Sequence, residues 1–187
     1  MPTTLFAAPE ATVDDLASVP ENAKAELVNG RIVLMPPTGI EPGYAGDEIF
    51  VSLRDYAKKT GNGRAVGDNK GFLVNLPHRK SFSPDAAYYL GKPSGMKFNQ
   101  GGPVFAVEVR SETDCGPIAE REMAEKRADY FACGTLIVWD VDMRGGKTIR
   151  SYGASDPKNP RVFRNGETAD AEPAVPGWRF PVDALDI

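Results

Sequence analysis

The stretch that decides the fold reads Val104-Phe-Ala-Val-Glu108-Val-Arg110. Its apolar run has the length of one β-strand, and such runs are typical of strands buried on both faces in the middle of a sheet. One acid, Glu108, interrupts it. Acids are depleted in strands and are almost never fully buried unless a partner compensates their charge. Glu108 therefore either has such a partner, for example a bound cation, or lies on an edge strand and faces water.

A hairpin and two helices are expected on either side of this stretch. Two β-prone runs within residues 25–35 are split by Asn29-Gly30, which is the strongest short-range signal for a hairpin. Apolar residues recur at three- and four-residue spacings over 45–60 and over 117–133. This spacing predicts two amphipathic helices, and a glycine follows each of them near the position of a C-terminal cap.

Further strands complete the expected order. They span residues 71–76, 84–90, 135–140, 148–152 and 161–163. A turn-rich loop with Pro157 and Pro160 is expected before the last of them, and a short helical turn capped by Thr12 or Asp14 before the hairpin. Strands interspersed with helices predict an α/β or α+β fold, in which helices pack on a sheet.

Length and composition indicate one globular domain. The chain has 187 residues, of which 41% are hydrophobic and 26% charged, which excludes a disordered or fibrous protein. We expect a single domain over residues 1–187, with residues 1–15 flexible. The apolar stretches are too short for a membrane helix and the N-terminus lacks a signal-peptide pattern, so a cytoplasmic protein without a membrane partner is expected.

Charge and cysteine content narrow the function classes. The net charge of −4 argues against strong non-specific attachment to nucleic acid and leaves room for a local basic groove. Cys115 and Cys133 form no CxxC pair, so we expect free thiols rather than a zinc site or a disulfide framework.

A second acid occurs in a strand context. Asp85 follows Pro84 at the start of an expected strand, with 22 residues between it and Glu108. Mg²⁺ usually binds one or two protein carboxylates and keeps several waters, so two acids on neighbouring strands could hold it. The spacing alone does not separate this reading from two acids that face solvent.

Several motifs occur in the order found in one known family. They are Glu26-Leu-Val-Asn-Gly-Arg-Ile-Val-Leu-Met-Pro-Pro, Ser83-Pro-Asp-Ala-Ala-Tyr-Tyr, Val107-Glu-Val-Arg-Ser111, Lys126-Arg-Ala-Asp-Tyr-Phe-Ala-Cys-Gly134-Thr-Leu-Ile-Val-Trp-Asp140 and the closing Pro176-Gly-Trp-Arg-Phe-Pro-Val. From about Leu16 to the end, the chain resembles the Uma-type putative restriction endonuclease family of the PD-(D/E)XK nuclease-like superfamily.

The resemblance implies a restriction-endonuclease-like mixed central sheet flanked by helices, with a Mg²⁺ or Mn²⁺ site on the sheet. The metal residues that it implies are Asp85, Glu108, Val109 and Glu26. Asp85 and Glu108 match the two motif acids, and Glu26 matches the acid of the opening segment. The alternative for Glu26 is a solvated charge at the start of the hairpin.

The cation of the motif is the point where this chain departs from the superfamily. Two residues after Glu108 a lysine is usual, whereas this chain has Arg110, which can stabilise phosphate charge but cannot act as a general base. Lys126 matches the family's lysine and is the second candidate for the catalytic cation. Alternatively, Lys126 lies on the solvated face of its acidic helix. The only histidine, His78, is expected at the surface.

The sequence thus predicts a metal-dependent endonuclease that hydrolyses phosphodiester bonds in DNA, with Asp85, Glu108, Lys126 and Arg110 as catalytic residues. The sequence leaves the oligomeric state open, and a homodimer is one candidate, because enzymes that cut both strands of a duplex often act as symmetric pairs. The rival is an inactive nuclease-fold module that binds a protein or a nucleic acid, favoured by Arg110 and by the acidic net charge.

Overall fold

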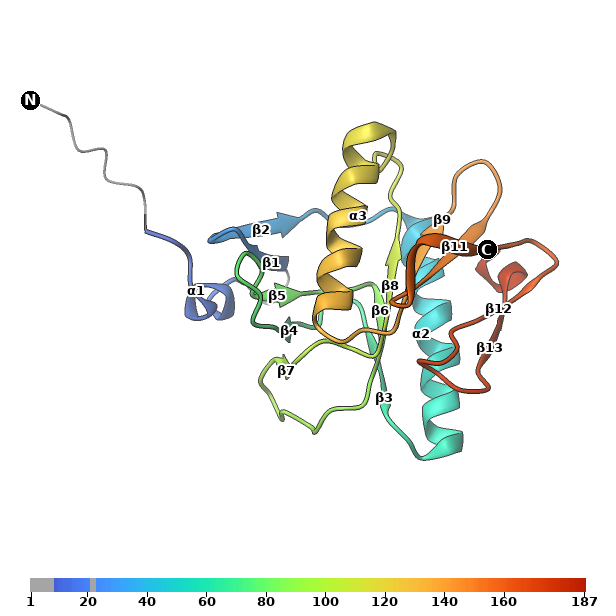
Figure 1. The fold of residues 1–187 in the computed structure, drawn as a ribbon, viewed down its shortest axis with the longest axis horizontal. Helices are drawn as coiled ribbons and strands as arrows, with labels where there is room; N and C mark the ends of the chain where they lie inside the picture. The colour runs from blue at the N-terminus through green and yellow to red at the C-terminus, as the bar shows by residue number, and fades with distance from the viewer. Residues whose placement is uncertain (1–8, 21–22) are drawn as a thin grey trace, which may run out of the picture.

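A six-stranded mixed sheet forms the centre of the molecule, whose computed structural model describes residues 9–20 and 23–187 (Figure 1). The strands are, in spatial order, β11 (Asp156–Arg164), β10 (Thr148–Gly153), β9 (Ile137–Asp142), β8 (Phe105–Val109), β6 (Ala86–Tyr89) and β3 (Arg64–Gly67). β8 and β9 run parallel, and all other neighbours in this sheet are antiparallel. β8 is therefore a central strand, so the edge-strand alternative for Glu108 is wrong.

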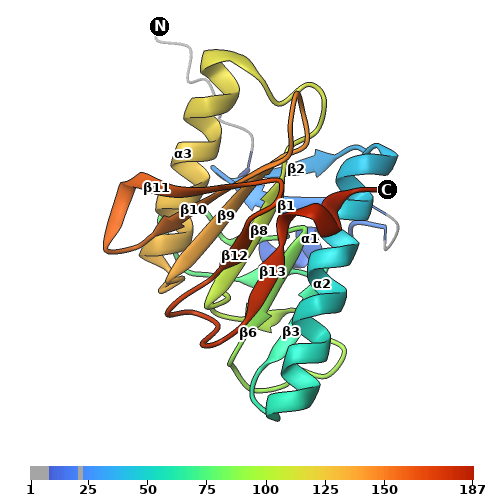
Figure 2. The same cartoon turned by 90° about the vertical axis from the view of Figure 1, so that its right-hand side faces the viewer.

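Two long helices cover opposite faces of this sheet (Figure 2). They are α2 (Ile40–Thr60) and α3 (Gly116–Ala132). Successive residues of β8 point to opposite faces, so Val107 joins the core that contains Ile49 of α2, while Ala106 joins the core that contains Tyr130 of α3. Glu108 lies two residues after Ala106 and thus also faces α3.

The C-terminal segment closes the α2 side of the sheet. It consists of the hairpin of β12 (Thr168–Asp170) and β13 (Arg179–Pro181), followed by the 3₁₀ turn η1 (Val182–Leu185). Trp139 of β9 and Trp178 pack here with ring centroids 5.1 Å apart, and both are buried.

Smaller elements lie beside α3 and bring the N-terminal segment to it (Figure 1). They are α1 (Val13–Ala17), the antiparallel pair β1 (Lys24–Val28) and β2 (Arg31–Met35), and the three-stranded sheet of β4 (Phe72–Leu73), β5 (Ser81–Phe82) and β7 (Asn99–Gln100). The backbone N–H of Leu27 donates to Ser81 Oγ at 2.8 Å, and Lys80 N–H donates to the Leu27 carbonyl at 2.9 Å. These bonds fix β1 against β5.

The predicted α+β class, the mixed sheet flanked by helices and the N-terminal hairpin are confirmed. Asn29 and Gly30 both have positive φ, 50° and 66°, as a tight hairpin turn requires. α2 begins five residues before the predicted start and ends at Gly61, whose left-handed φ of 66° makes it the C-cap. Cys115 and Cys133 are free thiols, as expected.

Two predictions about the elements were wrong, and one strand of the central sheet was missed. The expected loop around Pro157 and Pro160 is part of the edge strand β11, at an irregularity where its register with β10 shifts, and prolines are tolerated at sheet edges and bulges. The strand expected over 71–76 is reduced to the two residues of β4, and β3 was not predicted.

The structure describes only part of the N-terminal segment, and it confirms the predicted helical turn there. Residues 1–8 of the segment expected to be flexible lie outside the described residues. Thr12 caps α1 by accepting a hydrogen bond from the backbone N–H of Asp15, whose carboxylate accepts from the Thr12 N–H in return. None of the described helices has the length and apolar run needed to span a bilayer.

Candidate functional site

Asp85 lies directly before β6, where its carboxylate is fixed beside the end of β8. Its Oδ2 accepts a hydrogen bond from the backbone N–H of Val109 at 2.6 Å. This contact follows from the antiparallel pairing of β6 with β8, in which Ala86 lies opposite Val107. The predicted metal residues Asp85, Glu108 and Val109 are thus brought together by two adjacent strands.

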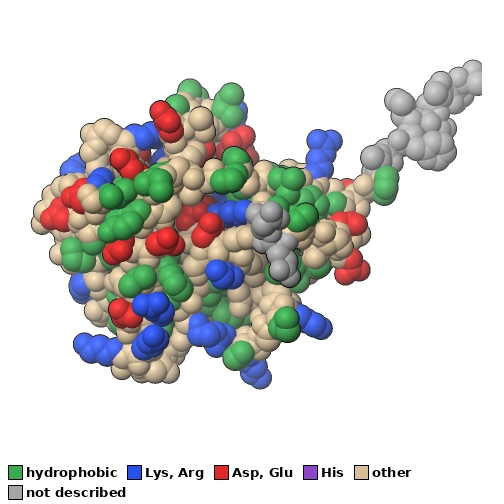
Figure 3. All heavy atoms as spheres, turned by 180° about the vertical axis from the view of Figure 1, so that it is seen from behind, with side chains coloured by type: hydrophobic (Ala, Val, Ile, Leu, Met, Phe, Trp, Pro, Cys, Tyr) green, Lys and Arg blue, Asp and Glu red, His purple; other side chains and the backbone are tan. Residues whose placement is uncertain are grey.

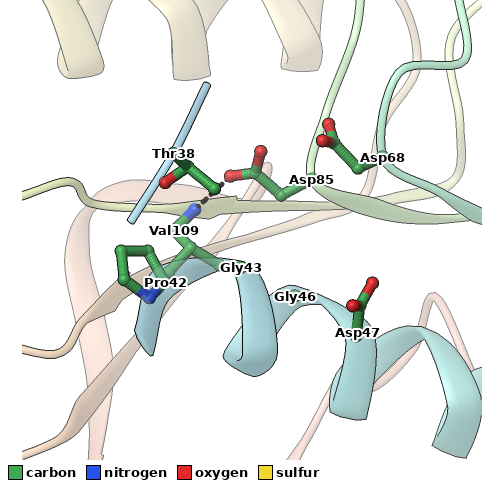
Figure 4. Close-up of a pocket in the computed structure, with 8 residues that line it drawn as sticks. All are labelled: Thr38, Pro42, Gly43, Gly46, Asp47, Asp68, Asp85 and Val109. Atoms are coloured by element: carbon green, nitrogen blue, oxygen red, sulfur yellow. Dashed lines mark hydrogen bonds between the residues drawn. The ribbon is translucent and has the colours of Figure 1, made fainter. Parts of the chain in front are cut away.

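A cavity of about 110 Å³ opens beside Asp85 (Figure 4). Its lining comes from the start of α2, from the segment before it and from the central sheet with its flanking loop: Thr38, Pro42, Gly43, Gly46, Asp47, Asp68, Asp85 and Val109. Lys24 Nζ lies 2.5 Å from Asp85 Oδ1 and 2.7 Å from Asp68 Oδ1. One ammonium group therefore joins two of the three acids that line the cavity.

Glu108 faces a second cation, Lys126 of α3. Lys126 Nζ lies 2.9 Å from Glu108 Oε1 and 2.9 Å from Glu26 Oε1, so it bridges β8 and β1. The hydroxyl of Tyr130 donates to the same Glu108 oxygen at 2.6 Å. Lys126 and Tyr130 are one helical turn apart and share a face of α3. The predicted alternative of a solvated Lys126 is wrong, because only 16% of its side chain is exposed.

Glu26 is held by donors from three directions. Its Oε1 accepts from the backbone N–H of Ser83 at 2.9 Å as well as from Lys126, and its Oε2 pairs with Arg79 Nη1 at 2.5 Å. Glu26 is buried, so the alternative of a solvated hairpin charge is wrong. Arg79 in turn donates through Nε to Asp129.

His78 contacts the far end of this network. Its Nε2 lies 2.7 Å from Asp129 Oδ1, and half of its side chain is exposed. The expectation of a surface histidine is confirmed, and its contact with Asp129 was not predicted. Because Arg79 and Asp129 separate it from Glu26, His78 does not reach the acids of the site.

The two acids that share Lys126 differ in their affinity for protons. Burial raises the pKa of Glu108, and the neighbouring charges of Asp85 and Glu26 add to this although Lys126 opposes it. Burial alone would also raise the pKa of Glu26, but Lys126 and Arg79 outweigh it, so that this pKa is lowered. Lys126 stays protonated because the two carboxylates raise its pKa more than burial lowers it. The negative charge of Glu108 is therefore less well compensated than that of Glu26, and Glu108 is the carboxylate that favours binding of a proton or a cation.

Arg110 does not join these acids. Its Nε and Nη2 donate to the two carboxylate oxygens of Asp140 at 2.6 and 2.7 Å, and Nη1 and Nη2 reach Glu120 of α3. Its remaining contact is the carbonyl of Asp114. All three donor nitrogens of this buried side chain are thus engaged away from Asp85 and Glu108.

The sequence analysis missed four participants: Lys24, Asp68, Arg79 and Tyr130. Lys24 could have been found, because it lies two residues before Glu26 on the same strand and side chains at that spacing share a face. Tyr130 likewise follows Lys126 by one helical turn. The sequence carries no comparable signal for Asp68 and Arg79, which lie outside the regular elements.

The donor chemistry of the site suits a hard divalent cation. Carboxylate oxygens are the ligands that Mg²⁺ prefers in proteins, and the Asp85 and Glu108 side chains lie close enough that the charge of Asp85 raises the pKa of Glu108. In the described part of the chain, no three His, Cys, Asp or Glu side chains form a group that could hold a metal ion. The residues therefore fit a cation held by two carboxylates, which would have to compete with Lys24 for Asp85.

Comparisons with known proteins agree with this fold and with the motifs. The profile of the family Uma2, described as a putative restriction endonuclease, matches residues 11–183. The crystal structure of a putative nuclease belonging to DUF820 from Anabaena variabilis is similar with a TM-score of 0.72 and 17% identity, over 93% of this chain and 96% of that one. At this identity the likeness concerns the fold. No curated protein matches the chain.

Proposed function

This chain belongs to the putative restriction endonuclease family Uma2, and from this premise we propose that it is a divalent-metal-dependent endonuclease that hydrolyses phosphodiester bonds in DNA. The observation that carries the proposal is the meeting of Asp85, Glu108 and Lys126, which come from different elements and were expected together from their motif positions. Glu108 is a buried acid with a raised pKa and a charged partner, and the neighbouring Asp85 lines a cavity. Buried acids with perturbed pKa values are typical of catalytic sites.

In the proposed mechanism Asp85 and Glu108 would hold Mg²⁺ or Mn²⁺, with the backbone of Val109 beside them. A bound ion of this kind lowers the pKa of a coordinated water and neutralises charge on the transferred phosphoryl group. Lys126 keeps its proton, so we assign it the task of stabilising negative charge on the phosphate rather than that of a general base.

Two residues orient this set. Tyr130 donates to Glu108 Oε1 and so fixes the carboxylate that Lys126 contacts. Glu26, expected as a metal ligand, already accepts from Ser83, Lys126 and Arg79, and we therefore assign it to the orientation of Lys126. Arg110, expected as a catalytic cation, is assigned to the stability of the sheet.

DNA as the substrate requires basic side chains that contact phosphates. On the face shown in Figure 3, many Lys and Arg side chains lie along the lower edge, whereas most acidic ones lie in the middle and upper part. This local separation fits a protein of net charge −4 that contacts a backbone at one edge. We further propose a homodimer, because a symmetric pair places two sites on the two strands of a duplex.

A nicking assay on supercoiled plasmid tests the proposal. We expect the parent chain to nick the plasmid with Mn²⁺ and not with a chelator, and Asp85→Ala and Glu108→Ala to be inactive because one remaining carboxylate cannot hold the ion against water. Asp55→Ala, which removes an exposed acid of α2, is the matched control and should nick normally. A folded parent chain that cuts neither supercoiled nor single-stranded DNA would contradict the proposal and favour a binding module.

A further inference from the structure

Lys24 is the one cation found in direct contact with Asp85 among the described residues. Its Nζ lies 2.5 Å from Asp85 Oδ1, and 16% of its side chain and 22% of that of Asp85 are exposed. The same nitrogen lies 2.7 Å from Asp68 Oδ1, and about half of the Asp68 side chain is exposed. Both acids line the cavity at the site.

The position of Lys24 is set by the fold rather than by chance at the surface. Lys24 and Glu26 alternate along β1 and point to the same side, where Glu26 contacts Lys126. β1 therefore delivers one cation and one anion to the site together. Burial on its own would lower the pKa of Lys24, but Asp85 and Glu108 raise it, so the ammonium stays charged.

We propose that Lys24 is a resident counter-cation of the metal site. Without metal its ammonium neutralises Asp85, and a divalent ion reaches Asp85 only when Lys24 gives up that contact. Asp68 then keeps the displaced ammonium beside the site, since it already binds the same nitrogen from the half-exposed rim. Lys24 thus sets the metal affinity and protects the fold from carboxylate repulsion when no metal is bound. This inference rests on the proposed function, because it takes Asp85 as a metal ligand.

The expected size of the effect follows from competition. A ligand that must first displace an occupied contact has its apparent affinity reduced by the fraction of molecules in which the contact is open. Because the Lys24 and Asp85 side chains are little exposed, we expect their contact to be closed in most molecules. Removal of the Lys24 ammonium should therefore tighten Mn²⁺ binding on the order of tenfold or more. The cost is stability: without metal, Asp85 would have lost its neutralising partner.

Calorimetric titration of the full chain with Mn²⁺ tests whether Lys24 competes with the metal for Asp85. We expect Lys24→Gln and Lys24→Met to bind Mn²⁺ about tenfold or more tightly than the parent, and Lys24→Arg, which keeps the charge, to bind as the parent does or more weakly. Lys158→Gln is the matched control, since it removes the same charge from an exposed position on the edge strand β11 and should leave the affinity unchanged. Melting curves add a second readout. Lys24→Gln should melt below the parent in chelator and gain more from Mn²⁺.

The possible failures are distinguishable. If the parent binds Mn²⁺ and both neutral variants bind it equally or more weakly, Lys24 does not compete and this inference is overturned while the metal site stands. If neither the parent nor any folded Lys24 variant binds Mn²⁺, the metal-dependent function fails and this inference with it. Circular dichroism establishes folding, and Lys24→Met, which keeps most of the apolar stem, carries the test if Lys24→Gln does not fold.

Discussion

Two buried charge networks start from residues two positions apart at the end of β8, Glu108 within the strand and Arg110 directly after it, and they differ in how their charges are matched. Arg110 forms a two-pronged pair with Asp140 of the neighbouring strand, and Arg127 adds a second cation to the same carboxylate at 3.2 Å. Glu108 shares the single ammonium of Lys126 with Glu26, and its pKa is raised. The first network pairs two arginines with two carboxylates, since Arg110 also contacts Glu120. The second has three carboxylates for two cations, since Arg79 pairs with both Glu26 and Asp129.

This difference separates a structural role from a functional one more clearly than the motif did. Arginine suits permanent pairs because its planar fork fits a carboxylate with two parallel bonds. A buried acid with a raised pKa costs stability, and such groups cluster at functional sites. The motif position favours Arg110 as the catalytic cation, but the contacts favour Lys126.

The largest effect is expected from breaking the matched network. Arg110→Met should lower the free energy of unfolding by about 3–5 kcal/mol, because it leaves Asp140 buried with only the longer contact to Arg127. Activity per folded molecule should change little. Denaturant titration measures the first quantity, and nicking normalised to the folded fraction measures the second.

Arg144→Met is the control for this prediction. Arg144 pairs with Asp142 at 2.9 Å but is partly exposed, so its loss should cost no more than about 1 kcal/mol. An Arg110→Met chain of nearly parental stability that no longer nicks DNA would reverse the comparison and make Arg110 the catalytic cation.

The second effect concerns the unmatched network and should appear in the rate. Lys126→Met should reduce Mn²⁺-dependent nicking about 10²–10³-fold, the usual loss when one group that stabilises transition-state charge is removed. Mn²⁺ affinity should stay similar or rise, because Glu108 loses a competing cation. Single-turnover nicking rates and calorimetry measure the two quantities.

Lys158→Met removes an exposed lysine from β11 and serves as the control for Lys126→Met. It should nick at the parental rate. Parental activity in Lys126→Met itself would show that Lys126 has a structural role only, as one more buried counter-charge.

Features that depend on local sequence signals could be predicted, whereas those that depend on long-range packing could not. Local signals were sufficient for the hairpin turn at Asn29-Gly30 and for the end of α2 at Gly61, because both depend on backbone conformations that few residues adopt. The acids Asp85 and Glu108 were found because an acid in a strand is costly. The extent of β11 was missed, since proline is tolerated there because the strand lies at the edge of the sheet and its register with β10 shifts at this place.

The partners of the acids depend on contacts between distant segments. Lys126 reaches Glu108 only because α3 packs with one particular face on the sheet. The apolar spacing predicted this helix but not its rotation, because the residues that α3 buries are Arg127, Asp129 and Tyr130. Arg79 reaches Glu26 only because β1 lies against β5. No local pattern in the sequence specifies either contact.

The smallest effect should come from Glu108→Gln, and its sign separates the two acids of the unmatched network. The two donors of Glu108, Lys126 and Tyr130, both reach Oε1, so the amide oxygen of a glutamine can accept both bonds. The pKa of Glu108 is raised above its ordinary value of 4.5 by burial and by the neighbouring acids. Between 4.5 and that higher pKa the folded chain holds a proton that the unfolded chain has lost, so the contribution of Glu108 to stability falls as pH rises through this window. Glu108→Gln lacks this loss and should be more stable than the parent at pH 7, by about 0.5–2 kcal/mol, with the difference shrinking towards pH 4.5.

Glu26→Gln is the counterpart. The pKa of Glu26 is lowered, so the stabilising effect of its charge is present above pH 4.5, and the variant should be less stable than the parent at pH 7. Chemical unfolding of the three chains in chelator between pH 4 and 8 measures these differences, and a Glu108→Gln chain that is less stable than the parent at pH 7 would show that the pair with Lys126 outweighs burial.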